Sequence, residues 1–453
     1  MMLNNYIDGP VVNPDAPASS LEAKQPWIDN GVGVVNPKCY YSLESMAAEW
    51  DRLWPRAWLL AGVTSDIPGV GDYFLFEIGH ESIICIRTEQ GLRAFFNVCS
   101  HRGSRLLRDE RGRRMKIVCP FHSWRYANTG ELLAITDRET FRNAVVCHNP
   151  GLTELAVAEK AGLVFVNMRE DPPPFEERFG LPEGYLEAYR IDEMHVVRHV
   201  RTEWKANWKI AVEAFYETYH LHQVHPETRY TMADLKVQCD LYPNGCSRMI
   251  VPIGAPSPRM KDQETLNDDL RWMLSEVGID PDTFQGTAQD VRPAIARAKR
   301  ARAGKKGLDY AAFTDGQLTD SWATGIFPNV QIGCHPEGVF VMRFLPHPTD
   351  PERFYYDTMT LFMATNEPDP IAPAWMGIPD GTDLTGGTRP KCEKLGVDEE
   401  ADLGLVLSQD ADLLPVVQAG VRSRAFKGQL WGEQEQRLRH FHAELDRYLS
   451  GEK

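Results

Sequence analysis

The sequence has no apolar run that approaches the roughly 20 residues needed to span a membrane. It also lacks a basic segment followed by an apolar segment at its start, so we expect no secretory signal. Basic residues are outnumbered, because 49 Lys and Arg face 64 Asp and Glu, which gives a formal net charge of −15. Since nucleic-acid binding requires clustered basic side chains, we expect no nucleic-acid partner and no membrane attachment.

Cysteine is also scarce, with nine in 453 residues, which is too few for a disulfide-stapled fold. We therefore expect a reducing, cytoplasmic location. Seven of the nine have no metal-ligand spacing, and we predict buried, reduced thiols there. These seven are Cys39, Cys85, Cys147, Cys239, Cys246, Cys334 and Cys392. Apolar residues (43%) and charged residues (25%) occur at the levels of a globular protein with two or three domains.

Short β-rich runs bounded by turn residues fill the segment from about residue 58 to residue 167. They predict an all-β domain over residues 55–170, which ends at a stiff triple-proline segment, 172–174. The predicted strands are 58–62, 73–78, 82–87, 94–98, 116–119 and 163–167.

Residues 1–54 and 171–453 are predicted to form a second, larger domain. Helical patterns cover 43–54, 208–220 and 433–449, and strand patterns cover 247–253, 339–345 and 354–364. Several strands followed by a terminal helix predict an α+β domain, with an antiparallel sheet covered by helices on one side. Residues 291–307 carry seven Lys or Arg. We interpret them as a solvated helix or loop, the alternative being a docking surface for an acidic partner.

Two short motifs in the all-β segment carry metal-ligand chemistry. Cys99-x-His101 and Cys119-x-x-His122 are separated by 17 residues. Structural zinc sites usually place two cysteines in one arm and two histidines in the other. Here each arm has one of each, so both arms can reach both irons of a binuclear cluster with Cys₂ on one iron and His₂ on the other. A mononuclear zinc site is the alternative.

The segment resembles the Rieske [2Fe–2S] motif, including the flanking Pro120, Trp124 and Gly130. Respiratory-chain Rieske proteins have two further cysteines where this chain has Ser104 and Phe121, so the resemblance is to the oxygenase and ferredoxin type. Many oxygenases have glycine directly after the second histidine, where this chain has Ser123.

A second group of acids and histidines lies further along the chain. On the predicted helix over 208–220, Glu213, Glu217 and His220 share one face. Pro226 is expected to end or distort the helix, which lets His225 reach the same metal, whereas His222 points away toward solvent or packing. Two histidines and one carboxylate form a face that leaves positions on Fe(II) open for O₂.

Glu217 is a poor source of that carboxylate if it orients His220. Asp410 and Asp412, on a predicted helix, are both candidates, and the residues alone do not separate them. The pattern resembles the catalytic domain of Rieske non-haem iron aromatic-ring-hydroxylating oxygenases, α-subunit type. That resemblance implies a helix-grip (START-like) domain, His220, His225 and Asp410 as iron ligands, and Glu217 as the bridging acid. Glutamate at the bridge is commoner in some monooxygenase and demethylase branches.

The resemblance covers about residues 54–234 and the Asp410 region. It implies one Rieske cluster (Cys99, His101, Cys119 and His122) and one mononuclear Fe(II). Electrons would pass through His122 and Glu217 to His220 across a subunit boundary in a homotrimer or α₃β₃ assembly. A separate flavin reductase, with or without a ferredoxin, is the expected donor, because no G-x-G-x-x-G motif follows a strand.

The expected reaction is O₂-dependent hydroxylation of an apolar, aromatic small molecule to a cis-diol, with residues 235–400 holding most of the pocket. An alternative within the class is a monooxygenase or demethylase acting on a C–H, N-methyl or O-methyl group. Alternatives of other classes are a Rieske electron-transfer protein and a zinc-stabilised interaction protein.

Overall fold

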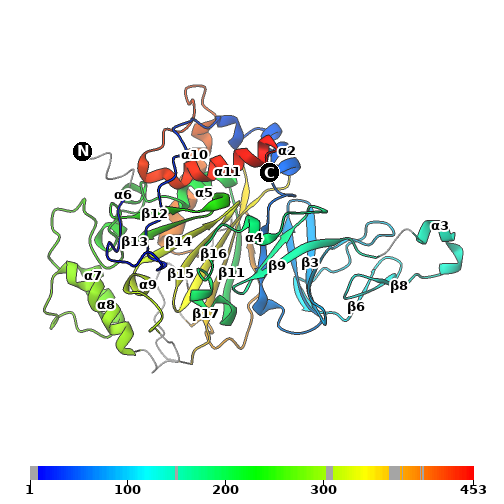
Figure 1. Cartoon of the computed structure of the whole chain (residues 1–453), viewed down its shortest axis with the longest axis horizontal. Helices are drawn as coiled ribbons and strands as arrows, with labels where there is room; N and C mark the ends of the chain where they lie inside the picture. The colour runs from blue at the N-terminus through cyan, green and yellow to red at the C-terminus, as the bar shows by residue number, and fades with distance from the viewer. Residues whose placement is uncertain are drawn as a thin grey trace. The chain divides into compact units, whose positions relative to one another are not determined.

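The computed structural model describes residues 9–147, 151–302, 310–366, 378–379, 381–397, 399 and 402–453. The chain divides into two compact units (Figure 1). The smaller unit is Trp50–Glu177, and the larger unit combines Met1–Glu49 with Arg178–Lys453. Within the described residues, no helix is both long enough and apolar enough to cross a bilayer.

The smaller unit is built from two antiparallel sheets. The larger sheet has the strand order β1-β10-β9-β4-β3-β2-β5 and the smaller one the order β6-β7-β8. Their bounds are β1 Leu59–Val63, β2 Asp72–Ile78, β3 Glu81–Thr88, β4 Gly91–Phe96, β5 Arg111–Arg113, β6 Lys116–Val118, β7 Arg125–Ala127, β8 Leu132–Ala134, β9 Glu154–Lys160 and β10 Leu163–Asn167. Two short helices accompany these strands: α3 (Asn143–Val146) lies between β8 and β9, and α4 (Phe175–Arg178) follows β10.

One hydrophobic cluster lies between these sheets and the loops that follow β4 and β6. It joins Ile84 and Phe95 of the larger sheet to Ile117 and Tyr126 of the smaller sheet, and it includes the buried Trp124. Burial of this apolar surface fixes the ends of β4 and β6. The loops that carry the two Cys/His motifs therefore start from rigid positions.

The larger unit is an eight-stranded sheet covered on one face by helices. The strand order is β12-β13-β14-β15-β16-β17-β11-β18. The bounds are β11 Met194–Trp204, β12 Gln238–Leu241, β13 Ser247–Val251, β14 Ser321–Ile326, β15 Val330–His335, β16 Gly338–Pro346, β17 Phe354–Met363 and β18 Glu393–Leu395. Neighbouring strands are antiparallel except β11 and β18, which pair in parallel.

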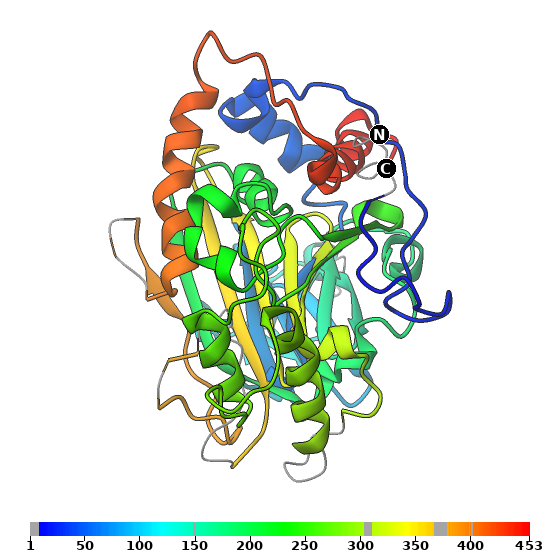
Figure 2. The same ribbon diagram turned by 90° about the vertical axis from the view of Figure 1, so that its left-hand side faces the viewer.

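Figure 2 shows the orange α10 and the red α11 on the same face of the sheet as the green helices. Phe215 at the end of α5 packs on Phe344 and Tyr356 of β16 and β17, with ring centroids 5.4 and 5.5 Å apart. The helix bounds are α2 Leu43–Arg52, α5 Trp208–Phe215, α6 Leu221–Val224, α7 Asp268–Glu276, α8 Ala288–Arg302, α9 Asp315–Thr319, α10 Leu405–Val421 and α11 Gln436–Ser450. The predicted α+β class, with helices against a largely antiparallel sheet, is confirmed.

The predicted helix over 208–220 is wrong beyond its first half. Asn207 caps α5 by accepting the backbone N–H of Lys209, and the helix ends at Phe215. Beyond that point the Glu217 carboxylate accepts the backbone N–H groups of Tyr219 and His220. A side chain that binds nearby backbone donors competes with helical hydrogen bonds, which explains the early end.

Two further predictions also need correction. The thiols of Cys85, Cys239, Cys246 and Cys334 are buried as predicted, but Cys147 is exposed and Cys39 and Cys392 are partly exposed. In the basic segment, α8 places Arg292 against Asp320, Lys299 against Glu337 and Arg300 against Asp315. The helix agrees with the first interpretation, but these three charges are paired within the chain and are not simply solvated. Residues 303–307 of that segment lie outside the described residues.

Candidate functional site

Two loops of the smaller unit bring the four predicted cluster ligands together. Cys99 and His101 follow β4, and Cys119 and His122 follow β6. The imidazole rings of His101 and His122 lie 4.7 Å apart in an edge-to-face arrangement. Both thiols are buried and free. The sequence prediction that these residues share one site agrees with this geometry.

The pKa shifts of Cys119 and His101 favour the metal-binding forms, whereas burial raises the pKa of Cys99. Burial raises the pKa of Cys119, but hydrogen bonds, those from the backbone N–H groups of His122 and Phe121 first among them, together outweigh burial. The net pKa of this thiol is therefore below its ordinary value. Burial, and then the charges of His122 and Arg102, lower the pKa of His101. A thiolate and a neutral imidazole are the forms that bind metal.

The ring nitrogens test whether these residues fit a cluster. The buried Nδ1 atoms of His101 and His122 have no hydrogen-bond partner among the described residues. Two unpaired imidazole nitrogens beside two thiols form the donor set of a Cys₂His₂ [2Fe–2S] cluster. Trp124 stacks on His101 with centroids 4.7 Å apart and an interplanar angle of 6°, which holds the ring in place.

The second group of ligands lies in the larger unit. His220 and His225 stand at the two ends of α6, and Asp410 projects from α10. Asp410 Oδ1 lies 3.1 Å from His225 Nε2 and 3.8 Å from His220 Nε2. One donor atom from each residue lies within 4.8 Å of the other two. Asp410 is 4% exposed, whereas Asp412 is exposed to solvent, so the geometry separates the two candidate carboxylates in favour of Asp410.

The Nδ1 atoms of both histidines are engaged, so their Nε2 atoms are free to face Asp410. Glu217 Oε1 lies 2.5 Å from His220 Nδ1. Gln409 Oε1 lies 2.6 Å from His225 Nδ1. Acceptors at Nδ1 keep the proton on that nitrogen and leave the Nε2 lone pair for a metal. The residues present therefore fit a two-histidine, one-carboxylate iron site.

Glu213 does not belong to this group, although the predicted helix placed it there. Its carboxylate accepts a hydrogen bond from the Tyr40 hydroxyl at 2.6 Å and lies 2.6 Å from His442 Nε2. Because α5 ends at Phe215, Glu213 and Glu217 do not share a helical face. His222 is exposed, as predicted.

Two neighbouring residues escaped the sequence prediction. Gln409 precedes the ligand Asp410, but a glutamine on a helix carries no spacing signal. Tyr126 places its hydroxyl 3.2 Å from Cys99 Sγ and 2.9 Å from Ser100 Oγ. The only available signal was that Tyr126 lies within a few residues of His122, on the strand that follows the loop.

A second triplet, His199, Asp357 and Cys392, also has closely spaced donor atoms. Asp357 is already bound by the guanidinium groups of Arg201 and Arg343, each at 2.6 Å. Burial raises the pKa of Asp357, but Arg343, Arg201 and His199 together hold it well below its usual range. Two guanidinium groups compensate this carboxylate, so we assign no metal to the triplet.

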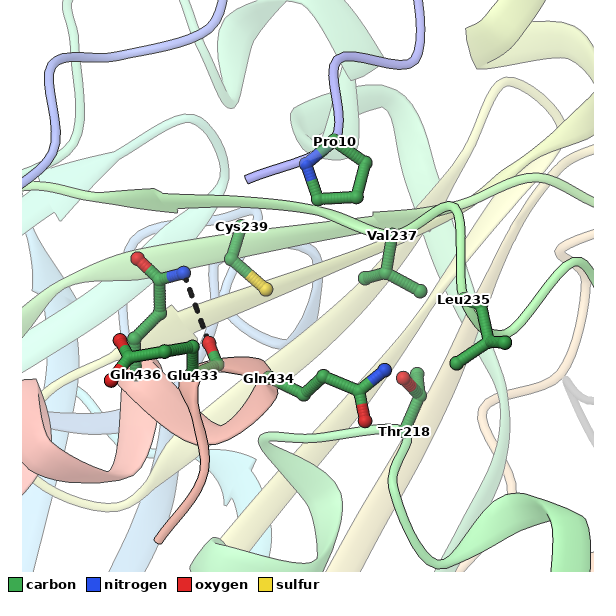
Figure 3. Close-up of a pocket in the computed structure, with 8 residues that line it drawn as sticks. All are labelled: Pro10, Thr218, Leu235, Val237, Cys239, Glu433, Gln434 and Gln436. Atoms are coloured by element: carbon green, nitrogen blue, oxygen red, sulfur yellow. Dashed lines mark hydrogen bonds between the residues drawn. The ribbon is translucent and has the colours of Figure 1, made fainter. Parts of the chain in front are cut away.

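A cavity lies beside the Glu217 loop, at the β12 edge of the sheet (Figure 3). Thr218, the residue after Glu217, lines it together with Val237 and Cys239, whose sulfur points inward in the figure. The remaining lining residues are Pro10, Leu235, Glu433, Gln434 and Gln436. None of the three candidate iron ligands lines this cavity, so it is separate from the metal face. The substrate pocket expected in residues 235–400 stays a prediction.

Comparison with known families assigns both parts of the chain. Residues 191–451 match the family described as ring hydroxylating alpha subunit (catalytic domain). The chain belongs to this family. Residues 57–147 match the Rieske [2Fe–2S] domain, so this ring hydroxylating α subunit carries both parts of a Rieske oxygenase. The predicted pair of cofactors, one [2Fe–2S] cluster and one mononuclear iron, is confirmed at the level of the family.

The similar proteins include both a monooxygenase subunit and a dioxygenase subunit. The α subunit is 32% identical over 229 residues to the glycine betaine monooxygenase oxygenase subunit of Chromohalobacter salexigens, covering 50% of each chain. It is 28% identical over 194 residues to the biphenyl 2,3-dioxygenase subunit alpha of Rhodococcus jostii, covering 42% of each chain. The chain spans about half the length of the curated relatives it matches.

The fold is shared with solved structures. A quaternary ammonium Rieske monooxygenase, studied for carnitine oxidation and inter-subunit electron transfer, superposes with a TM-score of 0.64. It is 18% identical, and the match covers 93% of this chain and 96% of that chain. At this identity the likeness shows the fold alone.

Proposed function

We propose that this chain is the terminal oxygenase component of a Rieske monooxygenase that oxidises a C–H bond of an N-methylated small molecule. The observation that carries the proposal is the convergence of His220, His225 and Asp410, with both histidines oriented through Nδ1. A Rieske electron carrier has no use for a second, open ligand face. A zinc-stabilised interaction protein does not account for the second ligand group, His220, His225 and Asp410, or for the match of residues 57–147 to the Rieske [2Fe–2S] domain.

When bound, the cluster supplies single electrons and the mononuclear iron supplies O₂ activation. His220, His225 and Asp410 would hold the iron on one face, and Cys99, His101, Cys119 and His122 would hold the cluster. Glu217 keeps the Nδ1 proton of His220 in place. We assign Glu217 as the bridging acid that faces the cluster of a neighbouring chain.

Two observations favour monooxygenation over the cis-dihydroxylation expected from the sequence. The relative with 32% identity is a glycine betaine monooxygenase subunit. The proposed bridging acid, Glu217, is a glutamate, and glutamate at the bridge is commoner in some monooxygenase and demethylase branches. Oxidation of an N-methyl group would insert one oxygen atom into the C–H bond, and the second oxygen would leave as water with two electrons and two protons.

Dihydroxylation of an aromatic ring is the second candidate, because the biphenyl dioxygenase α subunit is also similar to this chain. For either reaction we propose a flavin reductase, alone or with a ferredoxin, as the electron donor. The assembly would be a homotrimer or α₃β₃ complex, and the location would be cytoplasmic.

Product analysis with ¹⁸O₂ tests the proposal. The purified chain, a flavin reductase and NADH are incubated with glycine betaine, with carnitine, or with an aromatic hydrocarbon. We expect formaldehyde carrying a single labelled oxygen, before exchange with water, from an N-methylated compound. A cis-diol with two labelled oxygens would establish the dioxygenase instead. Two irons per chain would indicate an electron carrier, and a colourless zinc protein would overturn the oxygenase assignment altogether.

A further inference from the structure

His225 is held at both ring nitrogens by consecutive residues of α10. Gln409 Oε1 lies 2.6 Å from its Nδ1, and Asp410 Oδ1 lies 3.1 Å from its Nε2. The His225 side chain is 1% exposed, so it is enclosed at this position. The orientation of this imidazole is therefore set by a helix that begins about 180 residues further along the chain.

A third residue fixes which way the Gln409 amide points. Gln409 Nε2 donates a hydrogen bond to Glu227 Oε2 at 3.3 Å. An ionised carboxylate only accepts hydrogen bonds, so the amide NH₂ must face Glu227 and the amide oxygen must face His225. The reverse orientation would place the amide oxygen of Gln409 against the carboxylate oxygen of Glu227. Glu227 thus determines the role of Gln409 at Nδ1.

We propose that Gln409 is a positioning residue that selects the metal-binding tautomer of His225. Glu227 sets the Gln409 amide, the amide oxygen takes the Nδ1–H, and Nε2 presents its lone pair to the metal. The same bonds tie α10 to the segment that carries His225, which keeps Asp410 in register with it. The inference rests on the proposed function only in taking His225 and Asp410 as ligands.

The two histidines differ in the charge of their partners. His220 faces the Glu217 carboxylate, whereas His225 faces a neutral amide. A carboxylate partner increases the basicity of an imidazole ligand more than an amide does. The negative charge on the His225 side lies one hydrogen bond further away, on Glu227. Exchanging the amide at position 409 with the carboxylate at position 227 would leave the net charge unchanged.

Three variants test the inference in the full chain. Gln409→Leu removes the acceptor at Nδ1. The double variant Gln409→Glu/Glu227→Gln exchanges the amide and the carboxylate. The carboxylate introduced at position 409 would then accept hydrogen bonds from His225 Nδ1 and from the amide introduced at position 227. Gln223→Leu is the matched control, because Gln223 is an exposed glutamine near His225 in sequence. Each protein is challenged with an iron chelator, and the iron per chain and the electron paramagnetic resonance spectrum of the nitric oxide complex are measured.

We expect Gln409→Leu to bind the mononuclear iron about 10- to 100-fold more weakly, with an altered nitric oxide spectrum and an unchanged [2Fe–2S] absorbance. The exchanged pair should retain iron nearly as well as the wild type, and so should Gln223→Leu. Iron retention and spectrum unchanged in Gln409→Leu would overturn the inference. Loss of iron in the exchanged pair equal to that in Gln409→Leu would also overturn it. A wild-type chain that carries only the two cluster irons would refute the proposed function itself.

Discussion

The phenol oxygen of Tyr126 lies 3.2 Å from the sulfur of Cys99. Burial raises the pKa of Tyr126, so its hydroxyl stays protonated and can donate to the sulfur. A hydrogen bond to a ligand sulfur stabilises the reduced cluster, which has the more negative charge. This contact should therefore raise the reduction potential of the cluster.

Tyr126→Phe is expected to lower that potential by tens of millivolts, since roughly 1 kcal/mol of differential stabilisation corresponds to that shift for one electron. Redox titration of the visible absorbance measures it. Tyr73→Phe is the matched control, because the Tyr73 hydroxyl is buried in the same hydrophobic cluster and has no partner among the described residues. Equal potentials in the Tyr126 and Tyr73 variants would show that the sulfur contact has no effect.

Glu217→Gln is expected to keep both metal centres and to reduce turnover by at least about 10- to 100-fold. Glutamine can still accept the Nδ1–H of His220 through its oxygen. However, glutamine has no negative charge, and its NH₂ group would face the backbone N–H groups of Tyr219 and His220, which donate hydrogen bonds to Glu217 Oε2 in the wild type. Iron content, and the rate at which a pre-reduced cluster is reoxidised with substrate and O₂, are measured. Glu217→Asp, which keeps the charge with a shorter reach, should retain more activity. Wild-type reoxidation rates in Glu217→Gln would exclude a bridging role.

Asp410→Asn and Asp412→Asn form a matched pair on α10. Asp410 is buried and lies 3.1 Å from His225 Nε2, whereas Asp412 is exposed. Loss of a charged ligand should reduce the iron content of the Asp410 variant from three to two atoms per chain, while the Asp412 variant keeps three. Metal analysis with the cluster absorbance as internal standard checks this. Three irons in both variants would mean that Asp410 is not a ligand.

Most of the candidate ligands of both metal groups could be predicted from the sequence, because they lie in short motifs whose spacing brings them to one loop or one turn. Cys99 and His101 share a loop, and so do Cys119 and His122. His220 and His225 flank the single helix α6. Asp410 was different, since nothing local separates it from Asp412. The family resemblance made that choice, and burial against His225 supports it.

The outer contacts could not be predicted, because they join residues far apart in the chain. Gln409 meets His225 across 184 positions, and Glu213 meets His442 across 229. The prediction of a helix over 208–220 was wrong because of a side-chain contact that the apolar pattern does not show. Its apolar pattern continues past Phe215, but Glu217 binds backbone N–H groups locally and interrupts the helix. The edge strand β18 was missed because it is short and largely exposed.

Glu337 forms a buried ion pair with Lys299, with Oε1 and Nζ 3.4 Å apart. Burial raises the pKa of Glu337, but the opposing effects of His335 and Lys299 outweigh burial. The pKa of this carboxyl therefore falls from the ordinary 4.5 to about 2. A carboxyl whose pKa is depressed on folding stabilises the protein above its unfolded pKa. That stabilisation is lost as the pH falls from about 4.5 toward about 2.

Glu337→Gln should therefore lower the free energy of unfolding by about 3–5 kcal/mol, because it leaves the Lys299 ammonium buried without its counter-charge. The loss should persist down to pH 5, because the wild-type carboxylate stays ionised well below that pH. Urea denaturation at several pH values measures it. Glu276→Gln, at an exposed acid, is the control and should change stability by less than about 0.5 kcal/mol. A loss that shrinks already between pH 8 and pH 6 would contradict the depressed pKa.

Ser123 follows the candidate cluster ligand His122 and has a φ angle of +59°, in the left-handed region. Its side chain is exposed, so no packing compensates the strain of a β-carbon in this conformation, which costs roughly 1–2 kcal/mol. Ser123→Gly should remove the strain and stabilise the loop by about 0.5–1 kcal/mol after the greater unfolded-state entropy of glycine is subtracted. Thermal loss of the cluster absorbance should then occur at a higher temperature. Ser123→Ala separates the causes, because alanine keeps the β-carbon and loses only the hydroxyl. Equal stabilisation by alanine would place the effect in the side chain, whereas stabilisation by glycine alone shows that the backbone turn beside His122 stores the strain.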